Sequence, residues 1–262
     1  MSNAALHVAR TGLDAQNTKM RVIANNLANV NTTGFKKDRA DFETLAYQQI
    51  IQAGANSDSE NKFANGLNLG SGVALQGTSK INTQGTLNQT GNVLDIAIEG
   101  AGYFQVQQPD GSIAYTRAGN FTVTAEGTVV TSDGMPLIPQ ITVPQGATAV
   151  SIGNDGTVTA TLQGESEPSN LGQIEIATFM NPAGLTSVGG NLLTESAASG
   201  VPQVGVAGLE GRGLMRSGFL ETSNVNIVEE LVDMIETQRG YEVNSKMIKA
   251  TDEMLQYINQ NI

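Results

Sequence analysis

The two ends of this chain carry long apolar repeats of helical period, and no other feature constrains the fold as much. Near the N-terminus, apolar side chains recur at alternating steps of three and four residues from Leu6 to Val30, with Gln16 the one polar member. Near the C-terminus, a similar repeat runs from Val228 to Tyr257. Such spacing places each set on one face of a helix. A narrow apolar seam needs a partner, so these helices are expected to pack on each other or on other chains.

Asparagines crowd the end of the first predicted helix, between Asn25 and Asn31. Because Asn is a mediocre helix former, its repeated use beside an apolar seam favours amide hydrogen bonds that fix helix register. Ordinary fraying toward a helix cap is the alternative interpretation. The predicted assembly interface combines the two seams with two of these asparagines: Leu6, Leu13, Met20, Ile23, Asn26, Leu27, Asn29, Val30, Val228, Leu231, Val232, Ile235, Val243, Met247 and Met254.

Between the helices, the sequence is typical of β-structure with many turns. The chain of 262 residues contains 30 glycines, seven prolines and no tryptophan. Apolar and polar residues alternate over 95–99 and 104–107, and Asp110-Gly111 then marks a hairpin turn. Asn154-Asp155-Gly156 marks another. Short strands with frequent turn signals predict an irregular sandwich or barrel.

The predicted fold class is therefore α+β, with paired N- and C-terminal coiled-coil helices and a central all-β domain. We expect a discontinuous helical domain made of residues 1–34 and 223–262. Residues 35–66 are expected to form an extended arm or linker, because their composition is polar and mixed. Residues 67–222 are expected to form the β-domain.

Charge and composition exclude several classes of protein. The net charge is −11, from 14 basic and 25 acidic residues, which argues against nucleic-acid binding. The absence of cysteine excludes disulfides and thiolate metal sites. Apolar runs are too short for a transmembrane helix, so no membrane insertion is expected. His7 and Arg10 interrupt the N-terminal apolar stretch, which predicts export, if any, without a cleavable signal peptide.

Candidate chemical groups all have simpler interpretations. His7, the single histidine, has no nearby Cys or carboxylate, so a helix-surface position is favoured over metal binding. Glu165 and Glu167 fall in a polar segment typical of a solvated turn rather than a glycosidase pair. The glycine-rich stretch 66–72 lacks the lysine of a phosphate loop. We therefore predict no catalytic, cofactor-binding or metal-binding residues, and no enzyme activity.

Several segments resemble the bacterial flagellar rod and hook proteins. The stretch from Ala24 to Lys36 is similar to the N-terminal signature of that family, and residues 221–246 are similar to its C-terminal signature. In the middle, residues 95–100 and Gly102-Tyr103-Phe104 also match. The resemblance covers essentially the whole chain. Within the family, the chain is most like the distal-rod members, and a proximal rod subunit is the close alternative.

This resemblance implies a structural subunit that polymerises helically into the flagellar rod, the shaft that transmits torque from the motor to the hook. It implies a location in the basal body, with the rod spanning the periplasm. The partners implied are copies of the chain, proximal rod subunits, the hook protein, the outer-membrane and peptidoglycan ring bushing, the type III export apparatus and the rod cap.

Residues 47–65 resemble a rod-type segment that separates stiff rod members from the bendable hook. Its polar middle cannot form a core of its own, so its order must come from contacts outside the segment. Tyr47, Ile50, Ile51 and Phe63 are the apolar side chains able to make those contacts. A surface loop without mechanical role is the alternative.

Two functions of other classes remain open from sequence alone. One is a periplasmic module that binds or cleaves glycans, although the chain offers no tryptophan for a sugar platform. The other is a β-protein whose terminal helices merely pair with each other. Formation of filaments by the purified protein would separate both from a rod subunit.

Overall fold

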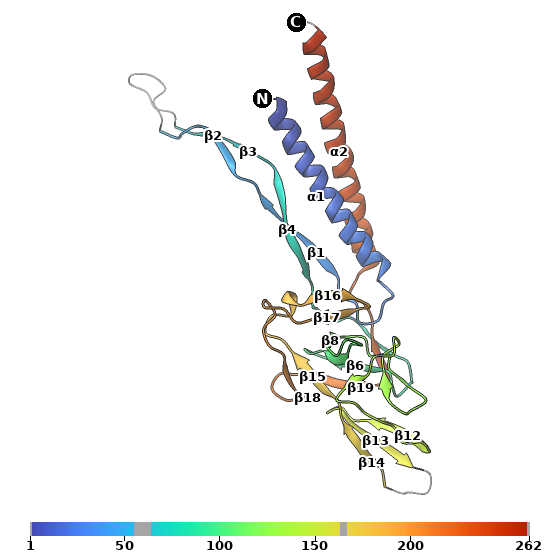
Figure 1. Cartoon of the computed structure of the whole chain (residues 1–262). Helices are drawn as coiled ribbons and strands as arrows, with labels where there is room; N and C mark the ends of the chain where they lie inside the picture. Colours follow the sequence, from blue (N-terminus) through green and yellow to red (C-terminus); the bar gives the residue numbers. More distant parts are fainter. Residues whose placement is uncertain (1, 55–63, 163–166, 261–262) are drawn as a thin grey trace. The chain divides into compact units, whose positions relative to one another are not determined.

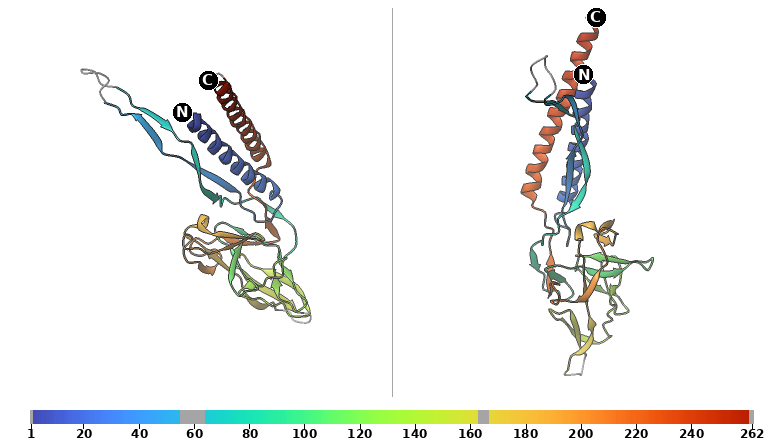
Figure 2. Two further views of the ribbon diagram at one scale, coloured as in Figure 1. Left: turned by 45° about the horizontal axis from the view of Figure 1, so that its top comes forward. Right: turned by 90° about the vertical axis from the view of Figure 1, so that its left-hand side faces the viewer.

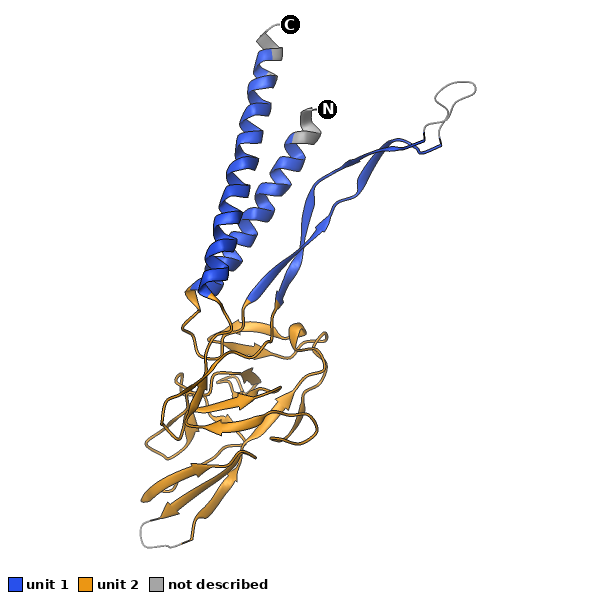
Figure 3. Ribbon diagram, turned by 180° about the vertical axis from the view of Figure 1, so that it is seen from behind, with its two compact units in different colours: residues 1–27, 38–79, 227–262 blue, residues 28–37, 80–226 orange. Residues whose placement is uncertain are grey.

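The computed structural model describes residues 2–54, 64–162 and 167–260, and it divides into two compact units. Unit 1 comprises Met1–Leu27, Asp38–Ser79 and Ile227–Ile262, and unit 2 comprises Ala28–Lys37 and Lys80–Asn226 (Figure 3). Two long helices and many short strands confirm the predicted α+β class.

Unit 1 contains both helices, α1 (Ser2–Ala28) and α2 (Ile227–Gln260). Its remaining part is a two-stranded ribbon in which β1 (Asp38–Thr44) pairs with β4 (Val73–Lys80) and β2 (Tyr47–Ile51) pairs with β3 (Leu67–Gly70). We call β1–β4 the β-ribbon. Within unit 1, α1 lies between the β-ribbon and α2 (Figures 1 and 2). β1 and β2 lie in residues 35–66, the segment expected to be extended. β3 and β4 lie beyond it, in residues expected to belong to the β-domain.

The first helix ends sooner than the apolar repeat does. The repeat predicted helix to about Asn31, whereas α1 ends at Ala28 and turns follow as far as Gly34. Gly34 has a φ of +70°, and a Cβ there would lie 2.6 Å from the carbonyl carbon of Arg117. Only glycine fits this close backbone approach without strain. Gly34 therefore serves packing as well as the turn that follows the helix.

Unit 2 is built from small antiparallel sheets. The largest has the order β11-β7-β8-β17-β16, and a separate three-stranded sheet has the order β12-β13-β14. Strand pairs β15–β18, β19–β6, β20–β5 and β10–β9 complete it. The bounds are β5 Leu87–Gln89, β6 Ile96–Glu99, β7 Phe104–Gln107, β8 Ile113–Thr116, β9 Thr122–Val123, β10 Val129–Val130, β11 Leu137–Ile138, β12 Ala147–Ile152, β13 Thr157–Leu162, β14 Ser169–Gln173, β15 Glu175–Thr178, the 3₁₀ turn η1 Pro182–Gly184, β16 Thr186–Gly189, β17 Leu192–Thr194, β18 Gln203–Val206, β19 Leu214–Ser217 and β20 Phe219–Glu221.

The predicted hairpins form where the turn signals stand. β7 and β8 pair around Asp110-Gly111, where Gly111 has a φ of +85°. β12 and β13 pair around Asp155-Gly156, and the Asp155 carboxylate accepts hydrogen bonds from the Thr157 hydroxyl and amide. These bonds favour the charged carboxylate and so lower the pKa of Asp155.

Aromatic and branched side chains fill the core of unit 2. Phe104 and Phe121 are fully buried and meet edge to face, with ring centroids 5.1 Å apart. Ile96, Ile98 and Ile176 pack in the same cluster. Burying each such side chain contributes about 1.5–3 kcal/mol, so unit 2 has a core of its own. A second cluster joins Tyr103, Tyr115 and Phe179 with Leu185 and Leu193.

Three charged side chains are buried together at one edge of unit 2. The Lys36 amine donates to the Glu221 carboxylate at 2.6 Å, and Arg117 Nη1 lies 3.5 Å from the other oxygen of that carboxylate. Burial lowers the pKa of Lys36, although the Glu221 partner opposes the shift. Arg117 also donates to the carbonyl of Ile98 and lies over the Tyr103 ring. One carboxylate thus balances two buried cations.

Removing this carboxylate should destabilise unit 2 strongly. Glu221→Gln would leave Lys36 and Arg117 buried without an anion, at a cost of about 3–5 kcal/mol. Lys36→Met, the matched control, should cost less because Arg117 still faces the carboxylate. Urea unfolding of both variants measures the difference, and an equal loss in the two would contradict this account.

Candidate assembly surface

The two helices of unit 1 pack antiparallel in one continuous register. A Cβ on Gly12 would lie 3.0 Å from the Asn244 amide nitrogen, and one on Gly240 would lie 3.2 Å from the Gln16 amide nitrogen. Nearer the start of α2, Asn26 donates to Glu230 at 3.2 Å. Along these three pairs the residue number rises in α1 and falls in α2, as antiparallel packing requires. The two glycines allow this close approach. Close packing therefore accounts for a residue of low helix propensity, Gly240, in the middle of α2.

Asn26 is the most tightly held of the asparagines and is 2% exposed. Its side-chain oxygen accepts from the Asp38 amide at 2.9 Å, and its side-chain nitrogen donates to the Asp38 carbonyl at 2.9 Å and to Glu230. One amide therefore ties α1 to both β1 and α2. The amide bond between helices that the asparagine cluster predicted is present at this position.

The apolar stripe of α2 faces away from α1. Val228 is 68% exposed, Val232 and Ile235 are 50% exposed, and Leu231 is also exposed. Farther along, Val243, Met247 and Met254 are exposed as well. Adjacent stripe residues recur on successive turns, so they form one exposed face rather than scattered positions.

The face of α2 turned toward α1 is polar. Glu230 and Thr237 are buried, seven residues apart, and Asn244 continues the same heptad spacing. Sequence reasoning looked for apolar seams and missed this polar line. The recurrence of polar residues at 230, 237, 244 and 251 was the available signal.

The predicted seam of α1 is more enclosed than that of α2. Ile23 is buried, and Leu6, Leu13, Met20 and Leu27 are partly buried. Asn29 and Val30 are also partly buried, but they follow the helix and belong to unit 2. The structure therefore brings the α1 and α2 residues of the predicted interface together only in part, since the α2 members point outward.

The outer half of the β-ribbon is almost wholly exposed. In β2, Tyr47 is 63% exposed and Ile50 is 56% exposed, while Ile51 is partly buried. The Tyr47 ring lies across the strand against Gly70, its paired residue in β3. Phe63 lies outside the described residues. A two-stranded ribbon is marginal in water by itself, so β2 and β3 present apolar side chains without a core beneath them.

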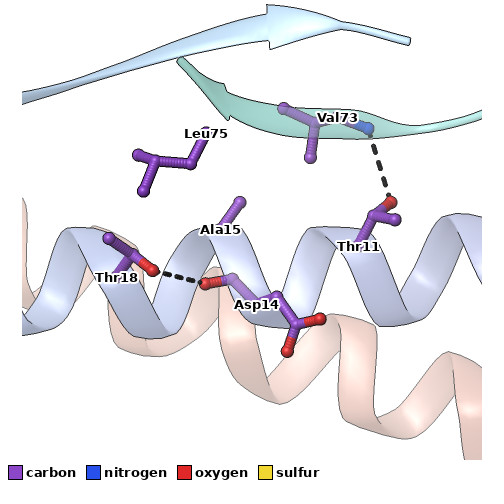
Figure 4. A pocket seen from close by; sticks show the side chains of 6 residues that line it. All are labelled: Thr11, Asp14, Ala15, Thr18, Val73 and Leu75. Carbon is purple, nitrogen blue, oxygen red and sulfur yellow. Dashed lines mark hydrogen bonds between the residues drawn. The ribbon is translucent and has the colours of Figure 1, made fainter. Parts of the chain in front are cut away.

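The inner half of the β-ribbon is held to α1. The Val73 amide donates to the Thr11 hydroxyl at 3.4 Å, and a cleft of about 120 Å³ lies beside this contact, lined by Thr11, Asp14, Ala15, Thr18, Val73 and Leu75 (Figure 4). Across the ribbon, Ser79 donates to Asp41 at 2.7 Å, and Arg39 donates to the same carboxylate. These two bonds lower the pKa of Asp41.

Within residues 2–54, 64–162 and 167–260, no three His, Cys, Asp or Glu side chains gather as a metal site would require. In that same part of the chain, no helix has a stretch apolar enough to cross a bilayer. The exposed features are apolar faces and strand edges, which suit contacts between proteins.

Three family models match the chain in order. One described as "Flagella basal body rod protein" matches residues 6–36, "Flagellar hook protein FlgE/F/G D1 domain" matches 97–160, and "Flagellar basal body rod FlgEFG protein C-terminal" matches 216–261. The first and last fall largely on α1 and α2, and the second falls on strands of unit 2. They define the class as structural proteins of the flagellar rod and hook, not enzymes.

Full-length relatives narrow the class further. The flagellar basal-body rod protein FlgG of Buchnera aphidicola (subspecies Acyrthosiphon pisum) is 50% identical over 98% of this chain and 98% of its own length. FlgG of Agrobacterium fabrum is 45% identical over 98% and 99%, and FlgG of Caulobacter vibrioides is 44% identical over 98% and 98%. The chain belongs to the FlgG family of flagellar basal-body rod proteins, the subunits of the distal rod. This confirms the distal-rod prediction over the proximal alternative.

Loss of the Asn26 amide should loosen unit 1. In Asn26→Ala the partly buried Asp38 amide loses its acceptor, at a cost of about 1–3 kcal/mol. Asn17→Ala on the exposed side of α1 should be neutral or slightly stabilising, because alanine is the better helix former. Thermal unfolding followed by circular dichroism measures both, and equal melting of the two variants would argue against the bridging role.

Proposed function

We propose that the chain assembles with copies of itself into the helical distal rod through the exposed stripe of α2, and that the rod transmits torque from the motor to the hook. The single observation that supports this most is the outward direction of Val228, Leu231, Val232 and Ile235, opposite the buried polar line of the same helix. A helix that turns its apolar side away from its own partner requires another surface to cover it.

The energetic argument favours assembly over a self-contained helical hairpin. Fully burying one valine, leucine or isoleucine side chain contributes about 1.5–3 kcal/mol. The stripe would add several such contributions when a second copy covers it, and association then stabilises the helices by mass action. A stripe that packs on a different surface of the next copy makes a heterologous contact. Heterologous contacts that do not close into a ring generate helical filaments.

We propose that the outer β-ribbon stiffens this filament. β2 and β3 expose Tyr47, Ile50, Leu67 and Leu69, and these side chains would be covered by neighbouring copies. A ribbon held to its own α1 at Thr11 and to a neighbour at its outer half would oppose sliding between copies.

The wider partners follow from family membership. We propose that the rod formed by this chain spans the periplasm and joins proximal rod subunits at one end and the hook protein at the other. The ring bushing, the export apparatus and the rod cap are the further partners proposed. No observation favours a glycan-binding or glycan-cleaving module.

A charge in the stripe should abolish assembly without unfolding the subunit. Leu231→Asp places a carboxylate on a face that becomes buried only in the filament, where an unpaired charge is costly. Thr148→Asp, on an exposed strand of unit 2, adds the same charge away from the stripe. Sedimentation of concentrated protein should show filaments for Thr148→Asp and monomers for Leu231→Asp. Normal filaments from Leu231→Asp would overturn the proposed contact.

Deleting residues 48–63 should change stiffness rather than assembly. The stripe of α2 remains in this variant, so filaments should still form, but they should be curved or more flexible. Electron micrographs give the persistence length directly. Straight filaments with an unchanged persistence length would refute the stiffening role and favour a surface loop.

A further inference from the structure

The chain passes between its two units four times, after Leu27, Lys37, Ser79 and Asn226. Force that acts on unit 1 can therefore reach unit 2 along these four peptide connections. If the four connections were independent linkers, each could bend without moving the others. In unit 2, however, the segments that begin and end at these connections are joined to one another by side chains.

Glu221 joins three of these segments. Its carboxylate accepts from the Lys36 amine at 2.6 Å and from the Gly85 amide at 2.9 Å, and its carbonyl accepts from the Gly34 amide at 2.8 Å. The Lys36 amine also donates to the Thr83 carbonyl at 2.8 Å. Glu221 is 1% exposed, so these bonds act in a medium where water competes little.

Asn224 joins the same three segments independently of Glu221. Its side-chain oxygen accepts from the Lys37 amide at 2.8 Å, next to one connection. Its side-chain nitrogen donates to the Ile81 carbonyl at 2.8 Å and lies within hydrogen-bonding distance of the Thr83 carbonyl and hydroxyl. The backbone adds a bond from the Ile81 amide to the Lys37 carbonyl at 2.9 Å.

We propose that Glu221 and Asn224 are positioning residues for the mechanical task of the rod. They fasten residues 34–37, 81–86 and 221–224 into one rigid body, which we call the connection root. Force arriving along any one connection is then shared by all of them. A subunit with separate linkers would bend or slip at each connection, whereas a subunit with the connection root yields only when the whole root opens.

Hydrogen exchange in the soluble monomer tests whether the root is one body. In Asn224→Ala the Lys37 amide loses its acceptor and should exchange faster. If the root opens as a unit, the Gly34 and Gly85 amides should also exchange roughly tenfold faster, although neither touches Asn224. Asn181→Ala is the matched control, since Asn181 makes a comparable bond to the Ala198 carbonyl elsewhere in unit 2. It should leave Gly34, Lys37 and Gly85 unchanged.

Faster exchange at Lys37 alone would overturn the proposal. If Asn224→Ala unfolds unit 2, the Gln107 amide in β7, which donates to the Pro136 carbonyl, will exchange faster as well. Asn224→Asp then replaces it, because aspartate keeps the acceptor for Lys37, whereas its second oxygen cannot donate to the Ile81 and Thr83 carbonyls and is repelled by them. Unchanged Gly34 and Gly85 amides in Asn224→Asp would equally overturn the proposal.

The filament part of this inference rests on the proposed assembly into a rod, whereas the exchange part does not. Filaments of a folded Asn224 variant should have a persistence length several-fold below that of the wild type. If the wild-type protein forms no filaments, the proposed function is refuted. The exchange result then decides by itself whether the connection root is one rigid body. Variant filaments as straight as the wild type would refute the mechanical role alone.

Discussion

The polar line along α2 is the constraint on which the rest of the structure depends. Glu230 and Thr237 are buried toward α1, and Gly240 and Asn244 meet the same helix. Because a helix has one period, committing this face to α1 forces Val228, Leu231, Val232 and Ile235 to the opposite side. Polar and small residues give the helix pair its register through bonds such as Asn26 to Glu230. The apolar residues are thereby left for other chains.

Sequence reasoning predicted elements more securely than it predicted partners. The terminal helices followed from the apolar repeats, and the hairpins at Asp110-Gly111 and Asp155-Gly156 followed from turn chemistry that is local. The N-terminal repeat also extends past α1, because Val30 continues the period beyond Ala28, where the helix ends. After the helix, Gly34 lies against the backbone of Arg117, and such a contact between distant residues leaves no periodic trace.

The direction of the α2 stripe and the buried ions could not be predicted for a related reason. An apolar stripe shows which face avoids water but not which molecule covers it. Lys36 stands in the charged run 36–39, yet it lies buried beside Glu221, 185 residues away. A charge pair of that separation depends on the folded path of the chain. The resemblance of residues 221–246 to a family signature located the segment without showing what Glu221 or Asn224 does there.

The pairing of the two chain ends has a consequence for when unit 1 can form. Asn26 and Glu230 are 204 residues apart, and the contact of Gly12 with Asn244 spans still more of the chain. During synthesis, α1 therefore waits for its partner until nearly every other residue has been made. A chain passing N-terminus first through any narrow conduit meets the same delay. The large sequence separation thus sets the order of events: the stripe is presented on a paired helix only after the last segment has emerged.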